Sequence, residues 1–333
     1  MSYVLANESE IAAIASAIRA KAETSSQYRL MDMASAIHNI SSKTISLYDY
    51  VMPELLSSEI GSREITKIGS CALYYCTSLT SVSFPECTDI YDKAFGFCSS
   101  LTSVTFPKCR TIGSSAFNGC ISLTTADFPE CINIGTDAFG YCTSLTSINF
   151  PECISIDTGA FAICSSLTSV IFQKCTYIGY YAFTGCRSLI SVTFPKCGTI
   201  GSSAFNACSS LTTADFPLCT RIEGGAFLSC SSLSSVSFPN CTSIDYNAFY
   251  DCWSLTSISF PNCISIGSYA FGYCKSMGVI YIGASNCYLG NSNVFYNTYI
   301  TSSTGSIYVP FSYVDTYKSS TNWSYFSSRI VGY

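Results

Sequence analysis

The dominant feature of this sequence is a cysteine that recurs every 11 residues, without a break, from Cys76 to Cys274. The stretch contains nine consecutive units of 22 residues, and the first unit, CTSLTSVSFPECTDIYDKAFGF, occupies residues 76–97. A fixed period of about 20 to 50 residues indicates a solenoid, because one short unit cannot bury its own apolar face and needs its neighbours to cover it. The cysteine ladder comprises Cys76, Cys87, Cys98, Cys109, Cys120, Cys131, Cys142, Cys153, Cys164, Cys175, Cys186, Cys197, Cys208, Cys219, Cys230, Cys241, Cys252, Cys263 and Cys274.

Each unit follows the pattern C-x-S-L-x-x-[VIA]-x-F-P-x-C-x-x-I-x-x-x-A-F-x-x. The segment L-x-x-V-x-F ends in alternating apolar residues, and a proline follows it in eight of nine units, with Gln173 as the exception. This predicts a short strand that stops where a residue has no N–H to donate. The segment I-G-x-x-A-F-x-x-C predicts a tight turn or one short helical turn. We expect stacked coils to pair their strands in parallel and to direct the Cys, Leu, Val, Phe, Ile and Ala positions inward.

The composition excludes several classes of protein. The 333 residues contain 16 Lys plus Arg and 21 Asp plus Glu, so the net charge of −5 argues against a charge-driven nucleic-acid binder. The hydrophobic fraction of 48% is enough for a sizeable core. The uncharged stretch from Cys252 to Cys274 contains Pro261 and many serines, so we expect no membrane insertion. The first residues lack a basic segment followed by an apolar one, and we therefore expect no secretory signal.

The repeated string C-x-S-L-T-S-V-x-F-P…I-G-x-x-A-F-x-x-C resembles the BspA-like, or Treponema pallidum-type, leucine-rich repeats of bacteria. The resemblance covers about residues 60–333, although P-x-C here replaces the asparagine-rich turn that usually follows the proline. It implies a β-rich leucine-rich repeat solenoid and a non-enzymatic surface protein for adhesion or recognition, with no particular ligand.

The pattern divides the chain into four parts. Residues 1–43 form a predicted helical adaptor or cap, 44–75 a linker and degenerate first coil, 76–273 the nine repeats, and 274–333 a degenerate coil and C-terminal cap. Within the last part, 307–309 is expected to be the final strand and 314–319 a short helix. We expect Trp323, Tyr325 and Phe326 to pack as a lid over the last coil.

Residues 1–43 carry two amphipathic segments. Asn7 and Glu10 form a capping box, and Ile11, Ile14 and Ile18 follow at helical spacing. About 35 residues of this region, I-x-x-I-A-x-A-I-R-x-K…L-x-D-M-x-x-A-I-x-x-I, resemble a segment of tail proteins from phages and prophages of Gram-positive bacteria. The resemblance implies contacts with other virion proteins, or a homo-oligomer, through residues 1–43.

The ladder cysteines are expected to be structural. A disulfide framework is disfavoured, because the spacing is a structural period, the total of 21 cysteines is odd and no secretory signal is expected. A metal site is disfavoured because no C-x-x-C pair occurs. We therefore expect each ladder cysteine to be a small buried residue with a weak S–H donor.

Binding specificity is expected at positions that differ between units, because the fold leaves those positions free. Aromatic residues collect there, and they supply contact area with a polar handle. Exposed tyrosines also suit any β-rich surface, so both interpretations stay open for the aromatic set. It comprises Tyr91, Tyr177, Tyr180, Tyr181, Tyr246, Tyr250, Trp253 and Tyr269. Polar residues that interrupt the Ser/Thr face of the predicted strands are further candidates, namely Asp127, Asn149 and Asp215.

Two functions fit the sequence. The first is a phage or prophage tail appendage in the virion, which would contact a glycan or protein of a bacterial cell surface through the solenoid. The alternative is a cell-associated BspA-like adhesin, on the cell surface or extracellular, that binds host protein or matrix. An enzyme is disfavoured, since His38 is the only histidine and no nucleophile with a base, paired acid cluster or phosphate loop occurs. We predict no catalytic residues, cofactor or metal.

Overall fold

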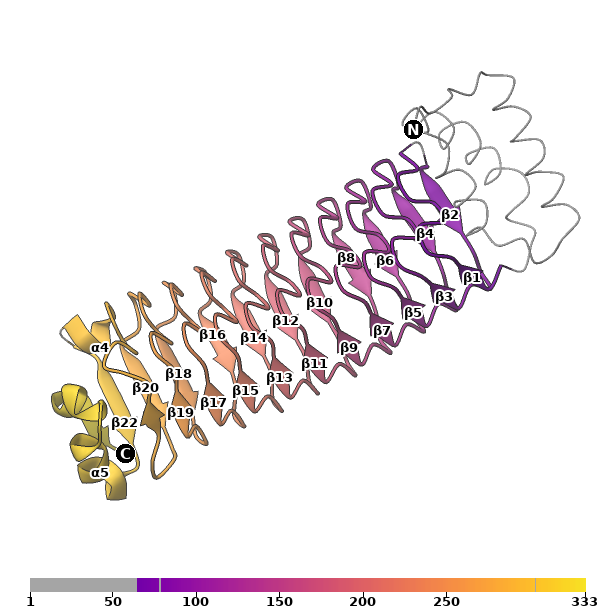
Figure 1. Ribbon diagram of the computed structural model, residues 1–333. Coiled ribbons are helices and arrows are strands. Elements are labelled where there is room, and N and C mark those ends of the chain that lie inside the picture. The colour runs from indigo at the N-terminus through magenta and orange to yellow at the C-terminus, as the bar shows by residue number, and fades with distance from the viewer. Residues whose placement is uncertain (1–64, 78, 303) are drawn as a thin grey trace, which may run out of the picture.

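The coils of the repeat stack along one axis into an elongated rod, with short helices at the C-terminal end (Figure 1). The computed structural model describes residues 65–333, except 78 and 303. The predicted solenoid of 22-residue coils with parallel strands and a C-terminal cap is confirmed over this range. The expected helices within residues 1–43 lie outside the described residues.

One side of the rod is an eleven-stranded parallel sheet, which follows the lower edge of Figure 1. Each coil contributes only two residues to it, and along the repeats the register advances by 22 residues, as in Ile68↔Ile90 and Ile90↔Ile112. The strands are β1 (Lys67–Ile68), β3 (Asp89–Ile90), β5 (Thr111–Ile112), β7 (Asn133–Ile134), β9 (Ser155–Ile156), β11 (Tyr177–Ile178), β13 (Thr199–Ile200), β15 (Arg221–Ile222), β17 (Ser243–Ile244), β19 (Ser265–Ile266) and β21 (Tyr288–Leu289).

A second side carries the longer strands, which include those that the sequence predicted, in four separate parallel sheets. The central residue of each three-residue strand points inward and its two neighbours point outward. These strands are β2 (Ser81–Ser83), β4 (Ser103–Thr105), β6 (Thr125–Asp127), β8 (Ser147–Asn149), β10 (Ser169–Ile171), β12 (Ser191–Thr193), β14 (Thr213–Asp215), β16 (Ser235–Ser237), β18 (Ser257–Phe260), β20 (Val279–Ile282), β22 (Ser306–Val309) and β23 (Ile330–Gly332).

Two details of the strand prediction need correction. The repeat pattern predicts one strand per coil, but each coil has a second strand of two residues, which is too short to show the alternation that identifies a strand. Proline is also not what ends the longer strands, because β10 stops at Ile171 although Gln173 replaces the proline in that coil. The strand ends at the same position in this coil as in the coils that have the proline, so the proline is not required for its end.

The third side consists of the predicted tight turns around the Ala-Phe pair, and it is also hydrogen-bonded from coil to coil. The amides of Cys71, Leu73 and Tyr75 donate to the carbonyls of Asp92, Ala94 and Gly96 in the next coil, at 2.9, 2.7 and 2.8 Å. We call this repeated set the turn ladder. All three donors point toward the C-terminal end, whereas in a parallel sheet donors and acceptors alternate.

The turn ladder requires two residues per coil in the left-handed region. Cys71 and Tyr75 have φ of 57° and 62°, and the corresponding residues of later coils are also positive. For a residue other than glycine this conformation costs about 1–2 kcal/mol. The cost is offset because each such residue directs its amide to a carbonyl of the next coil, a hydrogen bond worth about 0.5–1.5 kcal/mol.

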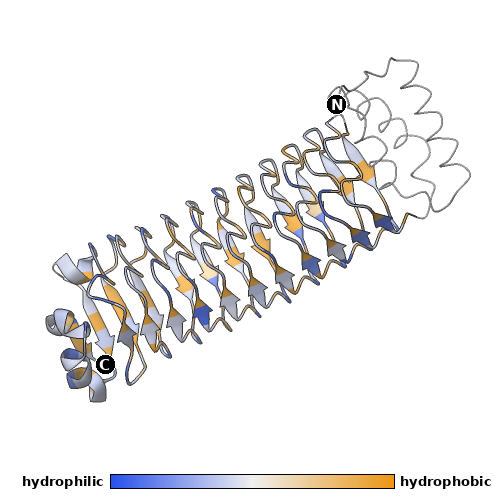
Figure 2. Cartoon of the chain, in the orientation of Figure 1, coloured by the Kyte–Doolittle hydropathy of each residue, from blue (hydrophilic) through white to orange (hydrophobic). Residues whose placement is uncertain are grey.

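The core between the three sides is built from stacked columns of identical residues. Phe95, Phe117 and Phe139 stack on one another with ring centroids 5.1 Å apart. Phe106 belongs to the second column and meets Phe95 edge-on at 5.8 Å. The inward set is confirmed, except that Ile148 and Val236 are only half-buried. Figure 2 shows apolar residues at the middle of the longer strands and hydrophilic residues on several two-residue strands.

The ladder cysteines fill two columns, and all of them are buried thiols. In one column the thiol donates to a carbonyl of the preceding coil, as Cys164 does to Phe139 at 3.2 Å. In the other it donates to the carbonyl two residues ahead, as Cys175 does to Tyr177 at 3.1 Å. Cysteine suits both columns because it combines a small apolar volume with one weak donor, which confirms the structural role expected from the spacing.

The C-terminal cap covers the open edge of the last coils. It contains α4 (Tyr299–Ser302), the 3-10 helices η2 (Phe311–Tyr313) and η3 (Trp323–Arg329), and α5 (Val314–Ser319), the helix predicted at 314–319. Trp323 is buried and donates its indole N–H to the Cys287 carbonyl at 2.5 Å, which confirms its role as a lid. Asn322 donates to Leu289 at 2.8 Å, so both side chains satisfy backbone acceptors at the sheet edge.

Two expectations for the cap were wrong. Tyr325 is 73% exposed and does not pack over the last coil, because η3 turns that side chain outward while Phe326 meets Phe295 edge-on. The strand at 307–309 is not the final one, since β23 pairs with β22 in parallel register.

The thiol hydrogen bonds lead to a stability prediction. Cys164→Ser should lower the free energy of unfolding by about 1–3 kcal/mol, because a more polar hydroxyl with a shorter bond replaces a buried thiol. Urea unfolding followed by circular dichroism measures the change, and Cys71→Ser at a half-buried position is the matched control. Equal stability of the Cys164→Ser variant and the parent would contradict the assigned packing.

The buried thiols also predict instability at alkaline pH. Burial raises the pKa of Cys87 to about 11 and that of Cys131 to about 12, from an ordinary 9.0. A thiol that stays neutral in the folded state but ionises in the unfolded state stabilises the fold below about pH 9, and this stabilisation is lost as the pH rises further. The melting temperature should therefore fall steeply as the pH rises from about 9 to about 12, between the unfolded and folded pKa values of these thiols. Thiolate absorbance that rises while the circular dichroism remains native would contradict this account.

Candidate binding surface

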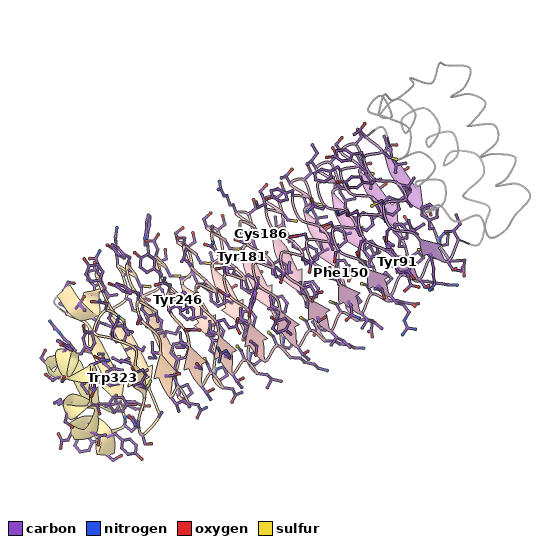
Figure 3. The ribbon with its side chains drawn as sticks, in the orientation of Figure 1. Tyr91, Phe150, Tyr181, Cys186, Tyr246 and Trp323 are labelled. Carbon is purple, nitrogen blue, oxygen red and sulfur yellow. The ribbon has the colours of Figure 1, made fainter. Side chains whose placement is uncertain are left out.

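The eight aromatic residues selected from the sequence all lie outside the core, but the structure does not bring them together. Tyr91, Tyr181 and Tyr246 are spread along the rod (Figure 3). Six of the eight are exposed, while Tyr250 and Tyr269 are half-buried. They fall into separate groups along the solenoid, so they do not form one site.

Tyr91 belongs to a small polar group near the first described coils. Its hydroxyl lies 3.5 Å from Nζ of Lys67, which also lies 3.4 Å from the Asp89 carboxylate. The hydrogen bond that Lys67 donates to Tyr91, and then the one that it donates to Asp89, raise the pKa of Lys67. All of these groups are at least partly open to solvent, and the arrangement is a surface ion pair of small energetic value.

A second group lies midway along the rod. Tyr177 stands on β11 and Tyr180 follows in the same coil. Burial, and then the nearby Glu223, raise the pKa of the Tyr177 hydroxyl, with further contributions from Tyr180 and Asp157. Tyr181, the next residue, occupies a left-handed position of the turn ladder with φ of 55°.

Tyr246 is separated from the other C-terminal aromatics because its ring lies back over the preceding coil. A Cβ atom on Gly224 would lie 2.5 Å from this ring, so the ring fits only above a glycine. Contact with Gly224 therefore accounts for the position of the Tyr246 ring.

The remaining aromatics gather on the last coils, where they form a continuous group with residues that the sequence analysis did not select. Tyr250 and Tyr273 have ring centroids 5.2 Å apart, and Tyr273 and Tyr296 have centroids 5.3 Å apart. Tyr269 meets Tyr296 at 6.2 Å, and its hydroxyl accepts a hydrogen bond of 3.0 Å from the Asn293 amide. The rings therefore cross three successive coils beside the turn ladder.

Trp253 lies in the same segment and is held by two charged groups. Its indole N–H donates to the Asp251 carboxylate, and Nζ of Lys275 lies 4.9 Å from the ring centroid. A cation at this distance is attracted to the ring face. The indole is nevertheless 47% exposed. We call Tyr250, Trp253, Tyr269, Tyr273 and Tyr296 the aromatic ridge.

The sequence contained a signal that would have identified Tyr273 and Tyr296. Tyr250, Tyr273 and Tyr296 are spaced by 23 residues, one more than the repeat. Tyr273 lies one position later in its coil than Tyr250, and Tyr296 returns to the Tyr250 position because the last coil is two residues longer. Asp251, Lys275 and Asn293 carry no such signal, because only the fold places them beside the rings.

The three polar candidates on the longer strands are divided between two places. Asn149 donates to the Asp127 carboxylate at 2.8 Å across the β6–β8 pair. Asp215 lies on β14, with β8, β10 and β12 between it and Asp127. As expected, the two aspartates do not form a carboxylate pair.

An open depression lies over the first two-residue strands and has a volume of about 380 Å³. It is lined by Thr88, Asp89, Arg110, Thr111, Ile132 and Asn133. It contains one acidic and one basic side chain but no aromatic ring, so it offers a ligand less apolar contact than the aromatic ridge.

Within residues 65–333, without 78 and 303, no group of three or more His, Cys, Asp or Glu residues is arranged to hold a metal ion. No helix in this same part of the chain is long and apolar enough to cross a membrane.

The sequence matches the family described as "BspA type Leucine rich repeat region (6 copies)" over residues 43–166, 88–212 and 198–322. These segments together cover most of the chain. This protein belongs to the BspA-type leucine-rich repeat family. The resemblance expected from the repeated string is thereby confirmed, and the fold is a leucine-rich repeat solenoid. A search of curated proteins finds no match.

Solved structures of similar repeat proteins are found in several bacteria. A leucine-rich cell surface protein of Faecalibacterium prausnitzii is 25% identical, with a TM-score of 0.44 over 79% of this chain and 80% of the other. A leucine-rich repeat protein of Bacteroides ovatus is 21% identical, with a TM-score of 0.45 over 81% and 88%. The T. pallidum leucine-rich repeat protein is 27% identical, with a TM-score of 0.44 over 53% and 77%.

The expected relation to phage tail proteins is not shown. The family match begins at residue 43, so most of the segment that carries the tail resemblance precedes it.

Proposed function

We propose that this protein is a non-enzymatic recognition protein of a bacterial cell surface, which binds an extracellular macromolecule through the exposed side of its solenoid. Membership of the BspA-type family supports the proposal. The observation that carries it is the division of every coil into constant buried positions and variable exposed ones. The buried columns are nearly identical from coil to coil, whereas the exposed neighbours change freely.

Exposed positions can vary because they contribute little to stability. Substitutions on a protein surface usually change the free energy of unfolding by less than about 0.5 kcal/mol, whereas core substitutions cost several times more. The position of Tyr250 is occupied by Asn118, Ala162 and Leu228 in other coils, so the fold does not require an aromatic residue there. The Tyr250 ring is half-buried over Gly272, and its exposed part is available for binding.

The cell-surface hypothesis is favoured over the phage-tail hypothesis. The tail hypothesis depends on residues 1–43, which lie outside the described residues and almost entirely outside the family match. The cell-surface hypothesis depends on the repeat array, which the family match covers. Binding to a host protein or to matrix stays a prediction. Oligomer formation through residues 1–43 also stays a prediction.

Electron microscopy with an antibody against the repeat array tests the proposal. On intact cells that express the native gene, gold label should follow the outer surface, and a gene-deletion strain is the matched control. Label confined to the cytoplasm, or to the tails of phage particles released from the same culture, would contradict the proposed function.

A further inference from the structure

We propose that the aromatic ridge is a carbohydrate-binding site for an uncharged chain of hexopyranose sugars. The proposal deepens the recognition function above and rests on it. It names the coils that make contact, at the C-terminal end of the solenoid, and the chemical class of the ligand.

The ridge is a file of neighbouring rings inclined to one another by 55° and 63°, in which Trp253 and Tyr296 are exposed and the other three are half-buried. Tyr250, Tyr273 and Tyr296 follow one another at 5.2 and 5.3 Å, roughly the distance between neighbouring coils. An apolar ring with a polar tip suits a sugar, which presents C–H groups on its faces and hydroxyls around its rim. A series of such rings in single file suits a linear chain better than a compact molecule.

The polar groups beside the rings are already held in place. Asp251 accepts the indole N–H of Trp253, and Asn293 donates to Tyr269. The second Asp251 oxygen accepts a hydrogen bond of 3.4 Å from the Ser229 hydroxyl and keeps a further lone pair. That oxygen and the amide oxygen of Asn293 can accept hydrogen bonds from sugar hydroxyls. Binding sites commonly combine apolar walls with a few placed polar groups of this kind.

The charge of the ridge favours an uncharged ligand. From residue 246 to residue 299 the chain contains only two charged residues, Asp251 and Lys275. They carry opposite charges, and both contact the Trp253 indole. Asp251 accepts the indole N–H, and Lys275 lies over the ring face. An anionic polymer would gain from Lys275 about as much as it would lose to Asp251.

The surroundings of the ridge favour a sugar over a protein. The centre of a protein interface is a desolvated apolar patch, commonly ringed by near-neutral contacts. Small polar residues such as Ser254, Ser268 and Asn297 flank the rings instead. Exposed Ile264 stands on another side of the rod, beside the start of β19.

The two tryptophans make the site observable by fluorescence. The sequence contains only Trp253 and Trp323, and Trp323 is 1% exposed beneath the cap. A ligand that stacks on the ridge should therefore change the emission of Trp253 alone. In the full chain we would titrate cellohexaose and chitohexaose, with maltohexaose as an α-linked comparison, and repeat the titration by calorimetry.

At least one of the β-linked hexasaccharides should bind with one-to-one stoichiometry. Trp253→Ala and Tyr273→Ala should each weaken binding about tenfold or more, the effect expected of a stacking anchor. Tyr91→Ala and Tyr141→Ala, which remove exposed tyrosines away from the ridge, should leave the affinity unchanged. Circular dichroism and the melting temperature establish that each variant is folded.

Failure of all three sugars to bind would overturn the proposal, as would affinities that the ridge variants do not reduce. Either result would leave the proposed function standing if gold label still follows the cell surface. Loss of surface label from the parent protein would overturn the proposed function, whatever the sugars do.

Discussion

The structure depends on backbone hydrogen bonds between each coil and the next. The two-residue strands and the longer strands pair residues 22 positions apart, and each turn-ladder amide donates to the carbonyl 21 positions ahead. Because all three sides share this register, a residue that is inward in one coil is inward in every coil. Identical residues therefore stack in columns. Each site within a column requires a side chain of the same volume and with the same hydrogen-bonding capacity.

The cysteine columns show how strict that demand is. Each site leaves room for one small side chain and presents one carbonyl, as with Cys164 below Phe139. A larger apolar residue would strain the neighbouring coils, and alanine would leave the carbonyl without its thiol donor. The outward positions face no such demand, and they hold the charged pair at Lys67 and Asp89 near one end and the aromatic ridge near the other. Stability and recognition thus occupy different positions of the same repeat.

The periodic parts of this fold could be predicted from sequence, and the rest could not, for physical reasons. The cysteine ladder and the inward leucines repeat nine times, so the pattern identified both the coil and its core. The two-residue strands were missed because their hydrogen bonds leave no alternation in the sequence. Tyr273 and Tyr296 were missed because their spacing departs from the period, and the exposure of Tyr325 depends on the direction of η3. Lys275 beside Trp253 follows only from the stacking of two coils.

Hydrogen–deuterium exchange of the intact chain tests the central claim most directly. If every side of the coil is hydrogen-bonded to the next, amides of the Ala-Phe turns, such as Phe117 and Phe139, should be protected as strongly as those of the neighbouring strands. Turns that belong only to their own coil would instead exchange quickly, as exposed loops do. Strong protection in the strands together with rapid exchange at these phenylalanines would contradict the account.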